Sequence, residues 1–480
     1  MESGEKKAAE EMESMDNESD GGSGRMIRPP SEASLCPTED EEDFTPMGPK
    51  CSIKEHLIKD KASTHTFLPV KHNLIAIQAD HIKGAVLFGK QTATSETTEG
   101  RALLKWKNTL FNTDALHSWS IANLHNICWN WTGITCNNVG AVYKIKLDSF
   151  SLSGTLESLH FHSFPNLTSF SLYNNTFTRS IPSAIANLSQ LVFLDLSRNE
   201  SNIFQFEQPS NFNCSRNMFY GPFPTSLVKL SKLKQLDLSG NGFYGSIPPT
   251  IGNLSSLTNL DLSYNMLKGS IPRSLCNLGS LEFMDLSNNI LEGLMPWCFG
   301  NISSLRYLYL NSNELKGSIP RSLCNLGSLE DMILSDNQLE GLMPWCFGNI
   351  SLIRYLYLNS NMLKGSIPRS LCNLGSLEFM NLSDNQLEGL MLWCFGNISS
   401  LRYLYLNSNM LKGNIPGSLC NLLSLEYMDL SSNSLEGLIP LCFGNISSLR
   451  YLHLYSNELN GSIPRSLCNL GSLTVQSWFP

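Results

Sequence analysis

The chain has 480 residues, of which 42% are hydrophobic and 16% charged, and its formal net charge is −8. This modest negative charge argues against a nucleic-acid-binding surface, which needs clustered Lys and Arg. No stretch reaches the roughly 18 consecutive apolar residues of a membrane-spanning helix. The polar, acidic N-terminus lacks the basic and apolar regions of a secretory signal peptide.

Residues 1–96 form an acidic leader that differs in composition from the rest of the chain. Its first 50 residues are rich in Glu, Asp, Ser, Gly and Pro, which is typical of a disordered segment. The remainder includes HNLIAIQADHIKGAVLFGK, which is compatible with one or two strands. We interpret the leader as largely unstructured or wrongly joined to the chain.

Residues 97–141 have the pattern of a small folded cap. The apolar residues of RALLKWKNTLF (residues 101–111) are spaced as on one face of a helix, so we expect a short amphipathic helix there. Cys128 and Cys136 follow, eight residues apart around a Trp-x-Gly turn. This spacing suits a disulfide-closed loop if the compartment is oxidising.

From residue 142 to residue 472 the chain repeats itself with a period of 24 residues, which is the strongest signal in the sequence. Thirteen repeats are followed by an incomplete one at residues 473–480. The repeats begin at or near Val142, Leu167, Leu191, Leu233, Leu257, Leu281, Leu305, Leu329, Ile353, Leu377, Leu401, Leu425 and Leu449.

One repeat is irregular, because 42 residues separate Leu191 from Leu233. Removing residues 200–217 restores the period, and the tripeptide Ser-Arg-Asn stands on both sides of the cut. We interpret 200–217 as an inserted or mis-spliced segment. The alternative is a genuine ligand-contacting loop that carries Phe204, Phe206 and Phe212.

Within a repeat, positions 1, 4 and 6 are apolar, and positions 4 and 6 have the two-residue period of a strand. One repeat cannot bury these groups alone, so successive repeats must stack with parallel strands and continuous leucine columns. Position 9 is Asn in twelve repeats, and a column of carboxamides can pair the backbone groups that each turn leaves unpaired. We interpret these Asn residues, with Gly at position 13 and Pro at position 16, as structural.

The repeat motif L-x-x-L-x-L-x-x-N-x-L-x-G-x-I-P resembles the plant-specific leucine-rich repeat, and residues 99–136 resemble the N-terminal cap of plant leucine-rich-repeat receptor-like kinases and receptor-like proteins. The resemblance covers residues 97–480. It implies an α/β solenoid: a right-handed superhelix with a concave parallel β-sheet and a short helical cap. It also implies an extracellular or plasma-membrane location, N-glycosylation and ligand sensing. Unlike that family, the chain shows no signal peptide, membrane span, kinase domain or closing cysteine pair.

Positions 3 and 5 point to the concave surface and carry many aromatic side chains, which suit recognition of a peptide or protein. The alternative is that one tolerated Tyr was copied, because the repeats from Leu281 onward are near-copies of a 48-residue block. No Arg-x-Arg pair of the kind that holds a ligand carboxylate in some related receptors occurs in these repeats. The candidate ligand-binding residues are Tyr307, Tyr309, Tyr355, Tyr357, Tyr403, Tyr405, Tyr427, Tyr451 and His453, with Phe283 and Phe379 on the same face.

Position 2 alternates in charge along the same repeats, which predicts a ladder at the edge of the concave face. Each exposed pair contributes only about 0–1 kcal/mol, so we interpret the ladder as support for strand register rather than as a docking site. Its members are Glu282, Arg306, Glu330, Arg354, Glu378, Arg402, Glu426 and Arg450.

The chain carries many Asn-x-Ser/Thr sequons, and five of them share repeat position 21, away from the concave strand, where glycans would leave the binding face free. The alternative is that the repeat consensus creates sequons incidentally. The predicted glycosylation sites are Asn130, Asn166, Asn187, Asn253, Asn301, Asn349, Asn397 and Asn445; further sequons include those at Asn174, Asn199, Asn213 and Asn381.

Nine further cysteines recur at positions 18 and 20 of the repeats, with spacings of 22 and 26 residues. A zinc site needs closer pairs, so we expect small buried thiols and no metal site. These cysteines are Cys276, Cys298, Cys324, Cys346, Cys372, Cys394, Cys420, Cys442 and Cys468. Phosphate loops, Gly-x-Ser-x-Gly elbows and His-Glu-x-x-His motifs do not occur, so we expect neither catalysis nor a cofactor.

We therefore expect a non-catalytic, receptor-like ectodomain that binds a peptide or protein ligand on its concave face. It would act alongside a co-receptor kinase and signal only through a partner. One alternative is a secreted inhibitor of a cell-wall-degrading enzyme, resembling polygalacturonase-inhibiting proteins, which predicts a shorter solenoid with a closing cysteine cap. Another is a truncated or fused gene product.

Overall fold

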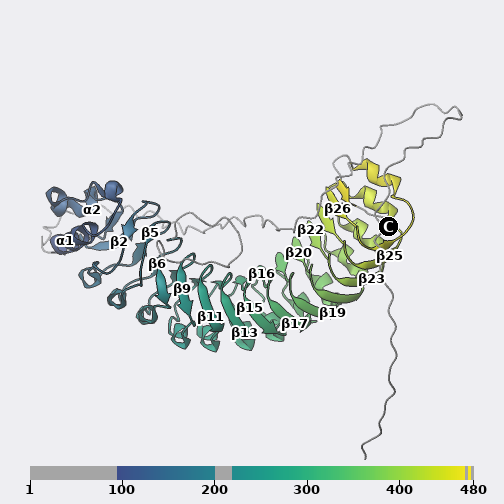
Figure 1. Cartoon of the computed structure of the whole chain (residues 1–480), viewed down its shortest axis with the longest axis horizontal. Coiled ribbons are helices and arrows are strands. Elements are labelled where there is room, and N and C mark those ends of the chain that lie inside the picture. The colour runs from purple at the N-terminus through teal and green to yellow at the C-terminus, as the bar shows by residue number, and fades with distance from the viewer. Residues whose placement is uncertain (1–94, 200–218, 471–473, 477–480) are drawn as a thin grey trace, which may run out of the picture. The chain divides into compact units, whose positions relative to one another are not determined.

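The computed structural model describes residues 95–199, 219–470 and 474–476. The predictions for residues 1–94 of the leader, for the irregular segment 200–217 with its three phenylalanines, and for the sequon at Asn213 lie outside the described residues. Within the described ranges, the helices and strands are those of a cap followed by stacked coils (Figure 1).

The cap contains the predicted helix, α1 (Ser95–Lys107), which begins and ends earlier than the apolar spacing indicated. The remaining helices of the cap are η1 (Thr113–Leu116), η2 (Ile121–Asn126) and α2 (Ile127–Asn130). Trp106 of α1 is fully buried, and its indole N–H donates to the carbonyl oxygen of Thr155 at 2.9 Å. The helix is therefore anchored to the first repeat.

The predicted disulfide between Cys128 and Cys136 is confirmed, with a Cα–Cα distance of 5.3 Å. It closes the loop that leads into β1 (Ile134–Cys136), which pairs antiparallel with β2 (Val142–Lys146). The cap thus supplies the first strand of the large sheet and covers the open end of the first coil.

The large sheet contains fifteen strands in strict chain order, parallel from β2 onward. Figure 1 shows its strands on the inner side of the curved row of coils. After β2 its strands are β4 (Ser169–Ser171), β6 (Phe193–Asp195), β8 (Gln235–Asp237), β10 (Asn259–Asp261), β12 (Phe283–Asp285), β14 (Tyr307–Tyr309), β16 (Asp331–Ile333), β18 (Tyr355–Tyr357), β20 (Phe379–Asn381), β22 (Tyr403–Tyr405), β24 (Tyr427–Asp429), β26 (Tyr451–His453) and β28 (Thr474–Gln476). The predicted α/β solenoid with a concave parallel sheet is confirmed.

A second parallel sheet of eleven strands covers positions 10–14 of the repeats and was not predicted. Each strand pairs with that of the next coil at an offset, so that Lys268 lies opposite Ile290. Its strands are β7 (Tyr220–Pro222), β9 (Gly242–Gly245), β11 (Met266–Ser270), β13 (Ile290–Leu294), β15 (Glu314–Gly317), β17 (Gln338–Leu342), β19 (Met362–Ser366), β21 (Gln386–Leu390), β23 (Met410–Asn414), β25 (Ser434–Gly437) and β27 (Glu458–Leu459). A small sheet of β3 (Ser153–Gly154) and β5 (Thr176–Phe177) continues this side toward the cap.

A row of short 3₁₀ helices forms the third side of each coil. Most of them follow the Pro at position 16, whose fixed φ suits a helix start. They are η3 (Phe161–Ser163), η4 (Ser183–Asn187), η5 (Thr225–Lys229), η6 (Pro249–Asn253), η7 (Arg273–Asn277), η8 (Trp297–Asn301), η9 (Arg321–Asn325), η10 (Phe347–Asn349), η11 (Arg369–Asn373), η12 (Trp393–Asn397), η13 (Gly417–Asn421), η14 (Leu441–Asn445) and η15 (Arg465–Asn469).

The Asn at position 9 has the structural role that the sequence predicted. The amide of Asn265 donates to the carbonyl oxygens of Leu238, Leu262 and Ser263 at 3.0–3.1 Å, and its Oδ1 accepts from the backbone N–H of Phe243. One carboxamide therefore satisfies backbone groups of two coils that would otherwise be buried without partners.

The residue before this Asn adopts a left-handed backbone in coil after coil, a feature that the sequence analysis missed. Examples are Tyr264 (φ 51°), Asn288 (φ 52°) and Ser408 (φ 53°). Non-glycine residues rarely adopt this conformation. The bend turns the chain out of the large sheet and places the Asn side chain inside the coil.

The cysteines at positions 18 and 20 were expected to be free thiols, and this prediction is wrong. Stacking places position 20 of one coil beside position 18 of the next, because the spacing of 22 is one period less two residues. The Cα–Cα distances of 5.6–5.8 Å allow disulfides. The pairs are Cys276–Cys298, Cys324–Cys346, Cys372–Cys394 and Cys420–Cys442, and Cys468 is also disulfide-bonded.

Across the described ranges, no helix is both long and apolar enough to cross a lipid bilayer.

Candidate ligand-binding face

The predicted aromatic residues line the concave sheet in two groups. Phe283, Tyr307 and Tyr309 form the first, with ring centroids 5.6–6.5 Å apart. β16 then interrupts the row, because it presents Asp331 and Ile333 instead.

The second aromatic group continues without a break from Tyr357 to His453. Neighbouring centroids are 4.4 Å apart for Tyr357 and Phe379 and 4.6 Å apart for Tyr405 and Tyr427. The parallel pairing of β18 through β26 places equal repeat positions opposite each other, and both of these stacks run diagonally from position 5 of one strand to position 3 of the next. The other members of the group are Tyr403 and Tyr451.

The candidate tyrosines differ in how much surface they offer to a ligand. Tyr309 is only 6% exposed, and its hydroxyl donates to Asp331 at 2.9 Å. It therefore packs within the concave face and offers little surface to a ligand. Tyr451 is 45% exposed. Burial raises the pKa of Tyr405 to about 12 and also raises the pKa of Tyr427, so these phenols stay neutral and can donate hydrogen bonds.

Tyr355 stands apart from both aromatic stacks. The Arg354 guanidinium lies over its ring, 5.6 Å from the centroid. Tyr307 and Tyr403 have the same relation to Arg306 and Arg402, at 5.4 and 5.6 Å. One edge of the aromatic face is therefore bordered by cations.

The charge ladder at position 2 forms separate pairs rather than a continuous network within the described residues. Arg306 pairs with Glu330 and Arg354 with Glu378, with closest N–O distances of 2.5 and 2.6 Å, and Arg402 pairs with Glu426. In each pair the Arg contacts the Glu of the following coil. The pairs link adjacent strands, in agreement with the predicted support for register.

At the C-terminal end of the face, Tyr427, Asp429 and His453 form a polar group. The Nδ1 atom of His453 lies 3.3 Å from Asp429 Oδ2 and 3.2 Å from the Tyr427 hydroxyl. His453 is the only His of the concave candidates, and it adds a ring nitrogen that can donate or accept a hydrogen bond to the aromatic face.

The N-terminal half of the concave sheet carries a different set of side chains, which the sequence analysis missed. Asp195, Asp237, Asp261 and Asp285 occupy position 5 of four consecutive strands. Each carboxylate accepts hydrogen bonds from the Ser two residues later; Asp261 accepts from the N–H and hydroxyl of Ser263 at 3.0 and 2.7 Å.

Burial, together with the next carboxylate in the column, raises the pKa of Asp195 and of Asp237 to about 7, although the Ser hydrogen bonds oppose the shift. Burial also raises the pKa of Asp261 and of Asp285, and the Asp285 carboxylate adds to the shift of Asp261. The column therefore holds protons near neutral pH that ordinary carboxyl groups would have lost.

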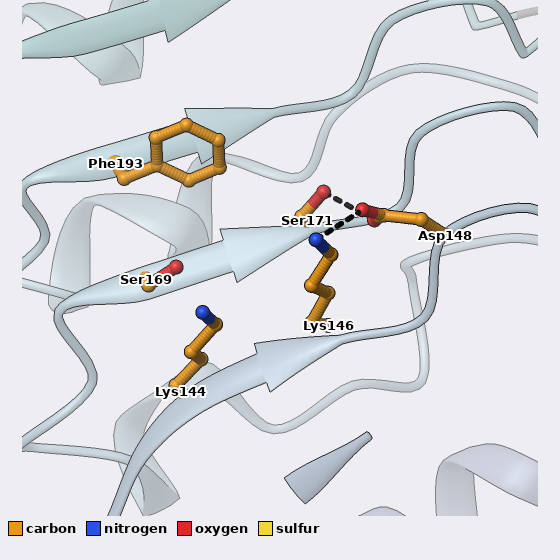
Figure 2. Close-up of a pocket in the computed structure, with 6 residues that line it drawn as sticks. All are labelled: Lys144, Lys146, Asp148, Ser169, Ser171 and Phe193. Atoms are coloured by element: carbon orange, nitrogen blue, oxygen red, sulfur yellow. Dashed lines mark hydrogen bonds and ion pairs between the residues drawn. The ribbon is translucent and has the colours of Figure 1, made fainter. Parts of the chain in front are cut away.

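A hollow of about 140 Å³ lies at the N-terminal end of the face, where β2, β4 and β6 meet. Figure 2 shows Lys146 directed at Asp148, which also accepts a hydrogen bond from Ser171, with Lys144 beside Ser169. Phe193 forms the remaining wall. The Lys146–Asp148 distance is 3.4 Å, so this basic patch is partly neutralised.

Comparison with known proteins identifies the framework. Models of the leucine-rich repeat match residues 231–291, 285–339, 328–387, 424–475 and 400–422, and a Zer-1-like leucine-rich-repeat model matches residues 141–246. The leucine-rich-repeat N-terminal domain matches residues 96–137. The chain belongs to the leucine-rich-repeat family.

Its relatives in this family are plant receptor-like kinases. Pollen receptor-like kinase 2 of Arabidopsis thaliana is 34% identical over 169 residues, which cover 33% of this chain and 24% of that protein. A structure of PEPR1 with AtPEP1 superposes with a TM-score of 0.70 at 31% identity, covering 79% of this chain and 52% of that one. The receptor RGFR1 in complex with RGF2 gives 0.55 at 30% identity, covering 66% and 51%. The chain thus spans about half or less of the length of these proteins.

The leucine-rich-repeat framework places all eight predicted glycosylation sites on the surface. Each of Asn130, Asn166, Asn187, Asn253, Asn301, Asn349, Asn397 and Asn445 is exposed. By contrast, the sequon residue Asn199 is fully buried and belongs to the column of Asn residues at repeat position 9, the Asn ladder. A glycan at Asn199 would require the coil to open.

Among the described residues, no cluster of three or more His, Cys, Asp or Glu side chains could hold a metal ion. His160 and His162, near the cap, contact each other edge to face, and His160 also contacts Lys105. The chemistry that this leucine-rich-repeat face offers is therefore aromatic packing, neutral phenol donors and a pH-sensitive acidic column.

Proposed function

We propose that this chain is the ligand-binding part of a plant receptor-like protein, a non-catalytic ectodomain that binds an extracellular peptide or protein on its concave face. The observation that carries the proposal is the unbroken aromatic group from Tyr357 to His453 on a rigid parallel sheet. Tyr side chains supply large contact area at low entropic cost, because few of their torsions are lost on binding.

Two further findings support an extracellular receptor. Its structural neighbours include PEPR1 with AtPEP1 and the plant peptide hormone receptor RGFR1 in complex with RGF2. Among the described residues, four disulfides join adjacent coils and another closes the cap, and such bonds persist in oxidising compartments. Signalling would then require a co-receptor kinase, which we propose as the second partner.

The test is a binding screen with the full chain secreted from plant or insect cells. Synthetic secreted plant peptides, beginning with AtPEP1 and RGF2, would be titrated by calorimetry. We expect at least one peptide to bind, and the double variant Tyr403→Ala/Tyr427→Ala to weaken it about 10- to 100-fold, because buried aromatic anchors dominate such interfaces.

The matched control is Tyr244→Ala, since Tyr244 is a half-exposed Tyr of the second sheet. This variant should bind the peptide like the wild type. A peptide whose affinity falls with Tyr244→Ala but not with the concave double variant would contradict the proposal, as would a screen in which no peptide or secreted protein binds.

A further inference from the structure

The row of 3₁₀ helices carries an alternating series of cations and indoles that the concave-face function does not use. At position 17 of six successive coils stand Arg273, Trp297, Arg321, Trp345, Arg369 and Trp393. All six side chains are exposed, and the three indoles are 58–63% exposed. Large exposed apolar groups in a repeated row mark an interaction surface.

The positive charge on this side of the coils is not balanced locally. Positions 13–24 of these coils (269–280, 293–304, 317–328, 341–352, 365–376 and 389–400) contain no acidic residue, and their only charged side chains are the three Arg. Within the described ranges, none of these guanidinium groups forms an ion pair. The row is therefore a cationic strip on a chain whose net charge is −8.

Carboxylates do occur nearby, but they belong to another row. Glu292, Glu340 and Glu388 stand at position 12, in the second sheet, where Lys268, Lys316 and Lys364 alternate with them. That row is balanced in sign and lies one bend of the chain before the 3₁₀ helices. It does not neutralise the Arg residues at position 17.

Each Arg is rigidly joined to the Trp that follows it. Cys276 lies in the 3₁₀ helix that Arg273 begins, and its disulfide partner Cys298 is next to Trp297. The same arrangement recurs for the other two Arg–Trp pairs through Cys324–Cys346 and Cys372–Cys394. The carbonyl oxygens of Trp297 and Trp393 also accept hydrogen bonds from Ser322 and Ser418 of the next coil.

Neighbouring coils are held about 5 Å apart by the strand spacing, so equivalent indoles recur about every 10 Å. An extended peptide presents side chains on one face about every 7 Å and falls out of step with this row. A pyranose in an extended 1,4-linked chain advances by about one strand spacing, so alternate sugars meet Trp and Arg. The apolar C–H face of a pyranose packs on an indole, and a carboxylate pairs with a guanidinium in bidentate geometry.

We infer that this strip, from Arg273 to Trp393, binds a linear 1,4-linked polysaccharide that carries carboxylates, a polyuronate. Trp297, Trp345 and Trp393 stack on alternate sugars, while Arg321 and Arg369 bind the carboxylates between them. A glycan on Asn301 would leave from the last residue of η8, whereas Trp297 is the first, so the two occupy opposite ends of that helix.

The two coils that follow the strip, which begin at Leu401 and Leu425, provide a natural control. They have the same disulfide, Cys420–Cys442, but carry Gly417 and Leu441 where the coils of the strip have Arg and Trp. Restoring both side chains with Gly417→Arg/Leu441→Trp should lengthen the strip by one Arg–Trp pair without disturbing the disulfide.

The experiment titrates the secreted, oxidised full chain with an oligogalacturonate long enough to reach from Arg273 to Trp393. We expect saturable binding that Trp297→Ala/Trp345→Ala/Trp393→Ala weakens about 100-fold or more. Arg321→Gln/Arg369→Gln should weaken it about tenfold at low salt and reduce its salt dependence. Gly417→Arg/Leu441→Trp should tighten binding of a longer oligomer by about threefold to tenfold.

The inference is overturned if oligogalacturonate does not bind, or if the Trp and Arg variants bind it like the wild type. Equal binding of a neutral 1,4-linked glucan of the same length would also overturn it, as would equal binding of polyglutamate, which would show a general polyanion surface. Tyr403→Ala/Tyr427→Ala should leave oligogalacturonate binding unchanged. Thermal unfolding of each variant confirms that these exposed substitutions leave the fold intact.

Discussion

The two halves of the concave sheet share one backbone but present opposite chemistry. From β6 to β12 position 5 is Asp in every strand, whereas from β14 to β26 positions 3 and 5 are largely aromatic. The Asn ladder is the same in both halves, as Asn265 and Asn409 show. The framework therefore fixes where side chains stand and leaves their chemistry free to vary.

The halves also differ in how their coils are joined. All the described inter-coil disulfides lie between Cys276 and Cys442, and none joins the described coils before residue 257. The aromatic half is thus covalently braced, and so are the coils of Asp261 and Asp285, whereas no described disulfide joins the coils that carry Asp195 and Asp237.

The largest effect is expected from reducing these disulfides. Each closes a loop of 22 residues and contributes about 3 kcal/mol by limiting the unfolded chain. Reduction should lower protection from hydrogen exchange in residues 257–448 far more than in residues 142–256, as measured by mass spectrometry with and without a phosphine reductant. An equal loss of protection in both regions would show that the inter-coil disulfides do not stabilise residues 257–448 selectively.

A smaller effect, of opposite sign in the acidic half, is expected from Asp237→Asn. The folded pKa of Asp237 is raised to about 7, so its stabilising contribution is complete below its unfolded pKa and is lost as the pH rises through 7. The wild type should therefore melt at a lower temperature at pH 8 than at pH 5. At pH 8, Asp237→Asn should raise the free energy of unfolding by about 2 kcal/mol relative to the wild type.

The chain supplies its own precedent for this substitution. Asn381 occupies the same repeat position in β20, and its Oδ1 accepts the N–H of Ser383 at 3.0 Å, just as the Asp residues accept from Ser. If Asp237→Asn lost stability at pH 8 as well as at pH 5, the carboxylates would not be repelling one another in the way the burial and spacing indicate.

The smallest effect is expected at the edge of the aromatic half. Arg354 and Glu378 are 47% and 26% exposed, so their pair should contribute less than about 1 kcal/mol. A double-mutant cycle of Arg354→Gln and Glu378→Gln, measured by urea unfolding at low and high salt, isolates the coupling. If the coupling free energy between Arg354 and Glu378 is the same at high salt as at low salt, the pair is not screened by solvent as its exposure predicts.

The sequence predicted most of the framework because its signals are local. Leu columns, the Asn at position 9 and the loop between Cys128 and Cys136 each depend on residues within one period or one turn. The inter-coil disulfides were missed because Cys276 and Cys298 become neighbours only when the coils stack. The same holds for the second sheet, whose strands find partners only in the next coil.

The candidate site was predicted in outline for the same reason. Period-two alternation indicates which face a Tyr occupies, but not that Tyr309 would be covered by its neighbours while Tyr451 stays open. The acidic column and the Arg–Trp strip are visible only when repeats are read across successive coils at a fixed position. A column-by-column alignment of the repeats would have shown both.

The disulfides also set a rule for how this chain can grow or shrink. Each joins a coil to the one after it, and the next disulfide begins with a fresh coil, so Cys298 and Cys324 are never bonded to each other. Deleting or copying 48 residues in register leaves each sulfur of the four described inter-coil disulfides with a partner. A change of 24 residues leaves one of them without its partner, so in an oxidising compartment this solenoid keeps these disulfides intact only when its length changes by two coils.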